Sequence, residues 1–282
     1  MILIKLFLPI SLAIIMFGMG MTLIPLDFTR VLKYPKAIII GLTNQLILLP
    51  IIGFSLAIGF NLESTMAIGV IILAVCPGGP TSNLVTQVCK GNIALSVTLT
   101  AITSFISIVT IPFILSFAMR YFNSNFGVTV ELSIIETIKQ IMVITVIPIV
   151  IGMLIRKFKP VFANRMEVPM RKASTIIFIV IFIAIVATKY DMIAEGMRKV
   201  GFLTLLLNIS TMGIGYLTAR LFKLDFKNAI SITVESGIQN GTLAFVIAIT
   251  ILNNMEMVIP TAAYSIWMYI TGLLMWILGK RK

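Results

Sequence analysis

The sequence predicts an all-α protein that crosses a membrane nine times, and three observations indicate this fold class. The chain has 282 residues, of which 59% are hydrophobic and only 11% charged, whereas about 25% of the residues of a soluble domain are charged. Apolar runs of roughly 17 residues or more recur along the chain, and each can cross a hydrocarbon layer of about 30 Å. The basic residues gather in every second connection between these runs, as they do in cytoplasmic loops.

The apolar runs define the expected elements and a single membrane domain over residues 1–282. We expect spans at about 2–23, 36–60, 66–89, 92–119, 133–156, 172–190, 200–221, 227–252 and 257–279. The first run lacks a basic segment before it and a cleavage site of small residues, so we expect it to be retained and not removed as a signal peptide. The longest basic connection, about 157–171, is too short to fold alone.

The distribution of the 22 Lys and Arg residues predicts the orientation in a plasma or inner membrane. Sixteen lie in one set of alternate connections, and the other set holds six, which are Lys5, Arg120, Lys139, Lys189, Arg198 and Lys199. Basic loops stay in the cytoplasm, so the C-terminus is expected inside and the N-terminus outside. The net charge of +12 therefore indicates topology, and we expect no nucleic-acid partner. No obligatory protein partner is indicated.

One carboxylate lies deep inside an expected span. Glu235 has no Lys, Arg or His within seven residues on either side. The other acidic residues fall in expected loops or at span ends; they are Asp27, Glu63, Glu131, Glu136, Glu167, Asp191, Glu195, Asp225 and Glu256. An ionisable group at that depth costs several kcal/mol unless something pairs with it. We expect such a group to mark a functional site; the alternative is a protonated Glu that is hydrogen-bonded to a neighbouring helix.

Two spans are interrupted by helix-breaking residues. Pro77, Gly78 and Gly79 stop a helix in "CPGGPTSNLVTQ" (76–87), and Pro80 is suited to the first turn of the next helix. In "ESGIQNGT" (235–242) two glycines flank amide side chains. A broken backbone cannot face lipid, so it must line a cavity. Paired interruptions in separate halves of a chain indicate the binding site of a secondary transporter.

Further oxygen atoms accompany the carboxylate. Five hydroxyl residues share one face of the span after the first break; they are Ser96, Thr100, Thr103, Ser104 and Ser107. Taken alone, this stripe is more typical of a helix–helix contact. Gln45 is an amide buried in the second span. Carboxylate, amide, hydroxyl and carbonyl oxygens suit a hard cation, and sodium fits a chain with no His. A proton carried by Glu235 is the competing interpretation.

Enzymatic chemistry has few candidate groups here. The chain has no His and no Walker A motif, and its two cysteines, Cys76 and Cys89, are expected to be free thiols. An intramembrane enzyme would need an aspartate pair, a Ser–His pair or a metal cluster inside the spans. We therefore expect no enzyme.

At these residues the chain resembles the bile acid:sodium symporter family. The segments "CPGGPTSN" with "KGNIALSVTLT", and "ESGIQNGTLA", are similar to the two signature segments of the family. The segments "IMFGMGMTLIPLDF" (15–28) and "GIGYLTA" (213–219) also match. The resemblance covers nearly the whole chain in the same order. It implies sodium-coupled symport of an organic anion into the cytoplasm, with two sodium ions as coupling ions and a bile-acid-like compound or small carboxylate as substrate.

The resemblance also implies an architecture of inverted repeats. With nine helices the chain would be a four-plus-five arrangement whose two broken helices cross. The first repeat would cover about 1–120 and the second about 130–280. A core domain would comprise about 36–120 and 200–280, and a panel domain about 1–35 and 130–190.

Site residues are implied position by position. The first sodium site would use Ser82, Asn83, Ser96, Thr100 and Glu235. The second would use Gln45, Glu235, Gln239 and the backbone carbonyls of Ser236 and Ile238. Asn240 matches a substrate contact of the family. The chain departs from the family at the other expected substrate positions, which are Pro80, Thr81, Met268 and Tyr269. These departures favour an apolar or amphipathic substrate body.

Overall fold

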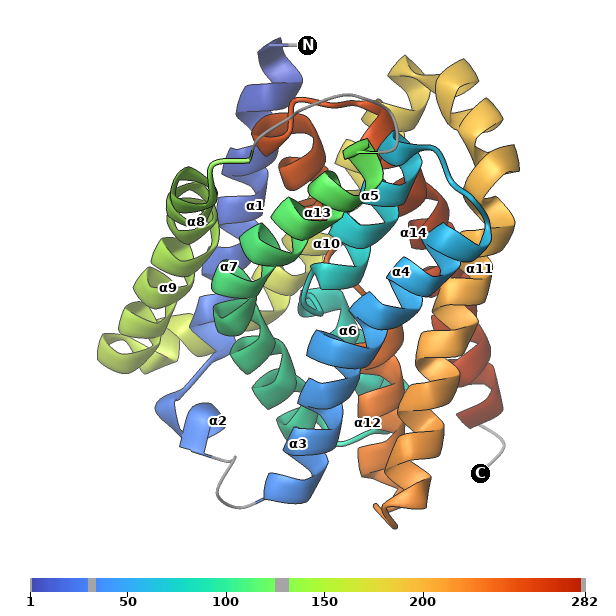
Figure 1. Cartoon of the computed structure of the whole chain (residues 1–282). Helices are drawn as coiled ribbons and strands as arrows, with labels where there is room; N and C mark the ends of the chain where they lie inside the picture. The colour runs from blue at the N-terminus through green and yellow to red at the C-terminus, as the bar shows by residue number, and fades with distance from the viewer. Residues whose placement is uncertain (1, 30–33, 125–131, 280–282) are drawn as a thin grey trace.

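The computed structural model describes residues 2–29, 34–124 and 132–279, which form one bundle of helices that run up and down its long axis (Figure 1). All elements in these three ranges are helical, so the prediction of an all-α fold is confirmed. The beginning of α1 (Ile2–Thr22) and the end of α14 (Ile259–Gly279) lie at opposite ends of the bundle (Figure 1). Which end faces the cytoplasm stays a prediction.

The remaining elements follow in chain order. The first half contains α2 (Pro25–Thr29), α3 (Pro35–Thr43), α4 (Leu49–Gly59), α5 (Ser64–Val75), α6 (Pro80–Val88) and α7 (Ile93–Ser124). The second half contains α8 (Ile134–Ile141), α9 (Ile147–Phe158), α10 (Pro160–Thr188), α11 (Tyr190–Leu221), α12 (Phe226–Gly237) and α13 (Gly241–Val246). A 3-10 turn, Glu256–Val258, precedes α14.

Within the described ranges, three π-helical segments widen the helices locally. Asn44–Leu48 joins α3 to α4, Met142–Val146 joins α8 to α9, and Ile247–Ile251 continues α13. Pro50 and Pro148 follow the first two segments within the first turn of the next helix. A proline ring clashes with the carbonyl group four residues earlier, and a wider turn accommodates the ring. The helices therefore continue through both prolines.

Six helical stretches among the described residues are long and apolar enough to cross a membrane. They are Pro35–Gly59, Ile93–Asn123, Ile134–Phe158, Pro160–Thr188, Tyr190–Leu221 and Glu256–Ile277. The other three expected spans coincide with shorter apolar helices, which are Phe7–Thr22, Ser64–Val75 and Gly241–Ile251. The total of nine crossings stays a prediction.

The expected connection at 157–171 is wrong, because α10 begins at Pro160 and runs without a break to Thr188. The expected connection before residue 200 is also helical, since α11 begins at Tyr190. In both segments charged residues interrupt the apolar run, but Arg, Lys, Glu and Met are good helix formers. The loss of hydropathy therefore marked the end of the apolar stretch and not the end of the helix.

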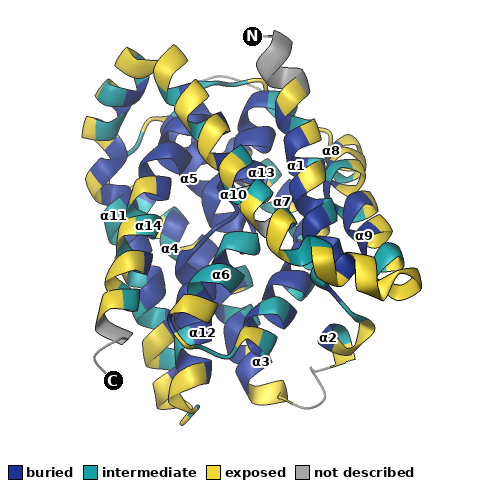
Figure 2. Cartoon of the chain, turned by 180° about the vertical axis from the view of Figure 1, so that it is seen from behind, coloured by how far each residue is buried: buried dark blue, intermediate teal, exposed yellow. Residues whose placement is uncertain are grey.

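The helices pack as two groups, which touch through α1 with α13, α7 with α8, and α10 with α6 and α11. One group is α1 with α9 and α10, and in the other α11 packs against α12 and α14 while α5 packs against α4 and α7. Figure 2 shows buried residues concentrated on central helices such as α5, and exposed residues on the outer helices. In the apolar stretches of α8–α9 and of α10 only 22% and 19% of residues are buried. Such continuous exposed apolar surface belongs in a bilayer.

Two glycines bring α1 and α9 into direct backbone contact. A Cβ atom on Gly20 would overlap the carbonyl group of Ile149, and one on Gly152 would overlap the backbone of Phe17 and Met21. Small residues at matching positions allow this close approach of membrane helices. The contact between α1 and α9 therefore includes main-chain atoms of both helices.

Candidate functional site

The two helix interruptions lie against each other at the centre of the bundle. The first separates α5, which ends at Val75, from α6, which begins at Pro80. The second separates α12 from α13 between Gly237 and Gly241. The Asn240 backbone N–H donates to the Pro77 carbonyl at 2.9 Å, and Gly78 and Gln239 form an isolated antiparallel bridge. Backbone groups released by one broken helix thus bond to those of the other.

Side chains bond to further backbone groups at the second break. The Gly237 carbonyl accepts hydrogen bonds from Asn208 Nδ2 and from the Tyr264 hydroxyl, each at 2.9 Å. Asn240 Oδ1 accepts from the Leu243 N–H at 3.0 Å and so caps α13. These bonds hold the interruption in one conformation.

Glu235 lies in a cage of hydroxyl groups from the other half of the chain. Its side chain is 4% exposed. The Ser82 and Ser96 hydroxyls donate to Oε1 at 2.7 and 2.5 Å, and the Thr100 hydroxyl donates to Oε2 at 2.8 Å. Asn83 Oδ1 lies 2.8 Å from Ser96 Oγ. The five residues expected to form the first sodium site therefore converge on one point.

A glycine makes this convergence possible. A Cβ atom on Gly78 would lie 2.5 Å from Glu235 Oε2 and 3.2 Å from Ser82 Oγ. Only a residue without a side chain allows the first break to pass this close to the carboxylate. The glycine of the first interruption thus provides the space for the acid at the second.

No basic side chain bonds to Glu235 in the described part of the chain. The ion pairs found there join Lys199 to Glu63 and to Glu195, each at 3.6 Å, and all three side chains are largely exposed. When it is ionised, a carboxylate held only by neutral hydroxyls has a negative charge that no bonded neighbour offsets. This cage suits an additional positive charge.

The hydroxyl stripe on α7 has two functions along its length. Ser96 and Thr100 reach Glu235. Thr103 and Ser104 instead donate to the carbonyls of Leu99 and Thr100, at 2.8 and 2.7 Å. Part of the stripe therefore serves the carboxylate, and part bonds to its own helix.

The residues expected in the second sodium site form an adjacent cluster. Gln45 Nε2 donates to Gln239 Oε1 at 2.7 Å and to the Cys76 carbonyl at 2.8 Å. Gln239 Nε2 donates to the Ser236 carbonyl at 3.0 Å. Gln45 lies in the π-helical segment Asn44–Leu48, and such segments are frequent at functional sites. The structure brings both amides and the Ser236 carbonyl together, and Ile238 lies within the same break.

All five residues expected to contact substrate line one small cavity. Pro80, Thr81, Asn240, Met268 and Tyr269 surround a volume of about 20 Å³. Phe178 of α10 and Ile15 of α1 complete its wall. The Phe178 ring stacks on Phe245, with ring centres 6.1 Å apart. A volume of this size holds about one water molecule, so the two helix groups meet here with no room for a larger solute.

Two acidic side chains are less exposed than the sequence pattern predicts: Glu167 is half-buried and Asp27 is buried. Glu167 was expected in a loop, but it lies on α10 and lines a second cavity of about 70 Å³ together with Pro80 and Asn83. Asp27 is 3% exposed, and its Oδ2 accepts from the Ile24 N–H at 2.8 Å. The polar residues around Glu167 resemble an ordinary surface segment, so nothing in the sequence indicated its position.

The chemistry of these groups is that of oxygen ligands. Among the described residues no group of three or more His, Cys, Asp or Glu could hold a metal ion. Cys76 and Cys89 are free and buried, as expected. Carboxylate, hydroxyl, amide and carbonyl oxygens around one negative charge are the ligand set of hard cations. The site can balance a cation without transition-metal chemistry.

Comparisons with known proteins agree with the signature segments. The sequence model of the "Sodium Bile acid symporter family" matches residues 9–196. The chain is 32% identical to the "Uncharacterized sodium-dependent transporter YocS" of Bacillus subtilis, over 94% of this chain and 80% of that protein. It is 25% identical to the human "Ileal sodium/bile acid cotransporter", over 84% of this chain and 67% of that protein.

A plant relative is longer than this chain. The "Probable sodium/metabolite cotransporter BASS2, chloroplastic" of Oryza sativa subsp. japonica is 24% identical over 93% of this chain, which spans 61% of that protein. The family model covers more than half of the chain and includes the first break, the hydroxyl cage on α7 and the apolar outer helices. The chain belongs to the sodium bile acid symporter family, whose members are sodium-dependent membrane transporters.

Proposed function

We propose that this protein imports an organic anion into the cytoplasm by symport with sodium. The observation that carries the proposal is Glu235, a buried carboxylate whose bonded neighbours are all hydroxyl groups. A transported cation supplies the missing positive charge, and its release leaves the carboxylate without compensation. The site therefore binds the coupling ion tightly only in conformations that keep Glu235 and the hydroxyl ligands close together.

The first sodium ion binds in the cage of Glu235, Ser82, Asn83, Ser96 and Thr100. Four of these residues come from α6 and α7, and Glu235 comes from α12. Hydroxyl hydrogens that now point at the carboxylate rotate away, and the same oxygens then face the ion. Because the ligands come from both halves of the chain, the ion fastens α12 to α6 and α7.

The second sodium ion binds between Gln45, Gln239 and the carbonyls of Ser236 and Ile238, with Glu235 shared. Support comes from the contact of the two amides with each other and of Gln239 with the Ser236 carbonyl. Each amide has a carbonyl oxygen that can turn toward a cation. Glu235 directly precedes Ser236 in the chain, which links the charges of the two sites.

The substrate binds in the cavity lined by Pro80, Thr81, Asn240, Met268 and Tyr269. It is about 20 Å³ in this conformation, so an organic anion enters only after the α1, α9 and α10 group has moved away from the other helices. This supports the assignment of about 1–35 and 130–190 as panel and of about 36–120 and 200–280 as core. The four-plus-five inverted repeat of nine helices is part of the same proposal.

Charge sets the order of binding. The site has a charge of about −1 when it holds no ion, and about +1 with two sodium ions, so an anion is first repelled and then attracted. Two sodium ions, Glu235 and one monoanion sum to zero. The bound complex therefore carries no net charge in the low dielectric of the protein interior. A bile-acid-like compound or a small carboxylate meets this condition.

Uptake into proteoliposomes tests the proposal. The protein is reconstituted with an inward sodium gradient and offered labelled cholate or pyruvate. We expect sodium-dependent uptake of at least one anion, and an inside-negative potential should increase it because two positive charges enter with one negative charge. A choline gradient is the control. Uptake driven by a pH gradient without sodium would establish the proton-coupled alternative, in which Glu235 carries the proton.

A further inference from the structure

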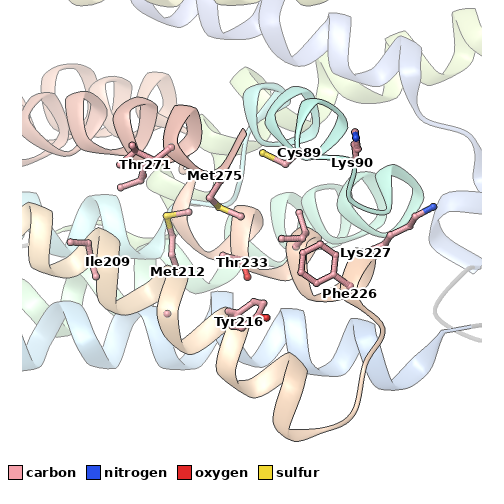
Figure 3. Close-up of a pocket in the computed structure, with 13 residues that line it drawn as sticks. Cys89, Lys90, Ile209, Met212, Tyr216, Phe226, Lys227, Thr233, Thr271 and Met275 are labelled. Atoms are coloured by element: carbon pink, nitrogen blue, oxygen red, sulfur yellow. The ribbon is translucent and has the colours of Figure 1, made fainter. Parts of the chain in front are cut away.

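A large groove shares no lining residue with the two small cavities, and its walls are almost entirely apolar. It has a volume of about 660 Å³ and is formed by α11, α12, α14 and the end of α6, as Figure 3 shows. Sites that hold small molecules typically have about 300–1,000 Å³. The groove is therefore large enough to hold a ligand, and none of the residues assigned above to sodium or substrate lines it.

The interior of the groove offers hydrocarbon contact and few free hydrogen-bonding groups. Ile209, Met212, Leu274 and Met275 form much of its wall. The two threonine hydroxyls are already engaged, because Thr233 donates to the Ala229 carbonyl at 2.7 Å and Thr271 donates to Asn208 Oδ1 at 2.8 Å. A ligand body that fits this interior is an alkyl chain.

The groove opens sideways, along the outer surface of the bundle. Ile209 is 53% exposed and Leu274 is 52% exposed, although both line the groove. They lie on α11 and α14, which also expose Leu217 and Leu273. In a membrane this opening faces lipid chains and not water, so the ligand enters from the bilayer.

One end of the groove is positively charged. Figure 3 shows Lys90 and Lys227 together at the end farthest from Ile209 and Thr271. Both lysines are exposed, and neither forms an ion pair within the three described ranges. The nearby carboxylate of Asp225 accepts two bonds from Asn228, at 2.8 and 2.7 Å, and caps α12. Both ammonium groups are thus available to an anion.

We propose that this groove binds an anionic phospholipid, with an acyl chain along α11 and the phosphate between Lys90 and Lys227. The part of the wall from Ile209 to Tyr216 is roughly 10 Å long at 1.5 Å per residue, which accommodates a segment of an acyl chain. Tyr216 lies on the wall between Ile209 and the two lysines in Figure 3. Basic pockets between membrane helices are suited to anionic headgroups.

Gly213 provides a variant that fills the groove without disturbing the protein. It lines the groove, and a Cβ atom added to it meets no other atom within 4 Å. A leucine there projects into the groove, and it favours the helix more than glycine does. Gly59 is the matched control, because its added Cβ also has open space and it lies on α4, away from the groove.

The test is a lipid titration of the detergent-purified protein, read by native mass spectrometry. Dioleoyl phosphatidylglycerol is compared with dioleoyl phosphatidylcholine. We expect one phosphatidylglycerol to bind in clear preference to phosphatidylcholine. The variant Gly213→Leu should lose this lipid, and Gly59→Leu should keep it. Equal binding of the two lipids to the wild type, or retention by a folded Gly213→Leu, would overturn the proposal.

Lysine variants test the position of the headgroup. Replacing both Lys90 and Lys227 by glutamine should weaken phosphatidylglycerol binding about thirtyfold, since each lysine near an anionic lipid contributes about 1 kcal/mol. Replacing Lys36 and Lys223, which lie outside the groove, should change it less than about threefold. Equal losses in the two pairs would show that the charge acts only over the whole surface and would refute a defined headgroup site.

Two further arms separate the lipid from other occupants. Glycerol 3-phosphate, a headgroup without chains, should not compete with phosphatidylglycerol. Competition by it would assign the lysines to a soluble phosphate and refute the lipid. If Gly213→Leu instead converted a dimer to a monomer, the groove would be an interface between two copies. In the wild-type protein, cholate and dioleoyl phosphatidylcholine are compared as competitors of bound phosphatidylglycerol. If cholate displaced phosphatidylglycerol and phosphatidylcholine did not, the groove would be assigned to the transported class of anion, and the proposal would be overturned.

Discussion

Replacing Glu235 by glutamine should remove sodium binding while it stabilises the sodium-free protein. The two side chains have nearly the same shape, so the cage of Ser82, Ser96 and Thr100 can close around the amide. The hydroxyl oxygens lie 2.5–2.8 Å from the carboxylate oxygens, and an ion among them sits within about 4 Å of the charge. At that distance and an effective dielectric constant of about 20, the attraction is about 4 kcal/mol. Loss of this attraction lowers the affinity for each sodium ion roughly a thousandfold.

The consequence for thermal stability can be worked out in both conditions. In sodium at about 100 times its Kd, one bound ion stabilises the wild-type protein by about 2.7 kcal/mol, which raises Tm by roughly 5–10 °C. In Glu235→Gln the same sodium concentration is about a tenth of the new Kd, so the rise disappears. Without sodium the variant should melt at a higher temperature than the wild type, because it no longer buries an uncompensated charge.

The assay is a melting curve of the purified protein in sodium and in choline at equal ionic strength. Ser96→Ala should reduce the sodium-dependent rise, because Ser96 touches Glu235. Ser104→Ala is the matched control on the same helix, since its hydroxyl bonds to the Thr100 carbonyl, and it should keep the full rise. A Glu235→Gln protein that still gained stability from sodium would refute the assignment of the carboxylate as the shared sodium ligand.

Three further predictions concern the surroundings of this carboxylate. Gly78→Ala should abolish sodium-dependent stabilisation, because its Cβ would lie 2.5 Å from Glu235 Oε2, whereas Gly59→Ala, with open space around it, should not; equal melting curves for the two variants would contradict the close approach. Gln45→Ala removes the amide that bonds to Gln239 Oε1. The sodium concentration for half-maximal uptake should rise several-fold, and the Hill coefficient should fall toward 1. An unchanged dependence of uptake on sodium would exclude Gln45 as a ligand. Glu167→Gln removes a negative charge beside Asn83, so KM for anions should fall at low salt. Glu195→Gln, at the surface, should have no such effect. The same KM in both variants would show that Glu167 does not face the path of the substrate.

The membrane-spanning pattern and the central carboxylate could be predicted because lipid imposes strict local requirements. A span needs an unbroken apolar run, and an ion inside it stands out; Glu235 was found by that contrast. The same reasoning located both interruptions, since Pro77 and Gly237 lie where no lipid-facing helix can stop. The structure places both breaks and the carboxylate where these arguments predict.

The contacts between distant segments could not be predicted from local pattern. Ser96 and Glu235 are 139 residues apart; the sequence pattern grouped their oxygens as candidate cation ligands, and only the family resemblance assigned them to the same site. Phe178, which closes the small cavity, lies in a run where every neighbour is equally apolar. Glu167 was assigned to a loop because charge ended the apolar run, although α10 continues through it. Which way a helix turns its side chains depends on its partners, and those come from elsewhere in the chain.

The main-chain contact between α1 and α9 has a consequence for biosynthesis. About 125 residues separate the end of α1 from the beginning of α9, and at 5–20 residues per second the ribosome needs on the order of 6–25 seconds to make them. During that time Gly20 has no partner, and α1 rests among lipid chains. Membrane helices are stable individually before they associate. A helix whose partner is synthesised this late must therefore be inserted independently. The apolar sequence of α1 makes it stable in the bilayer before α9 is made.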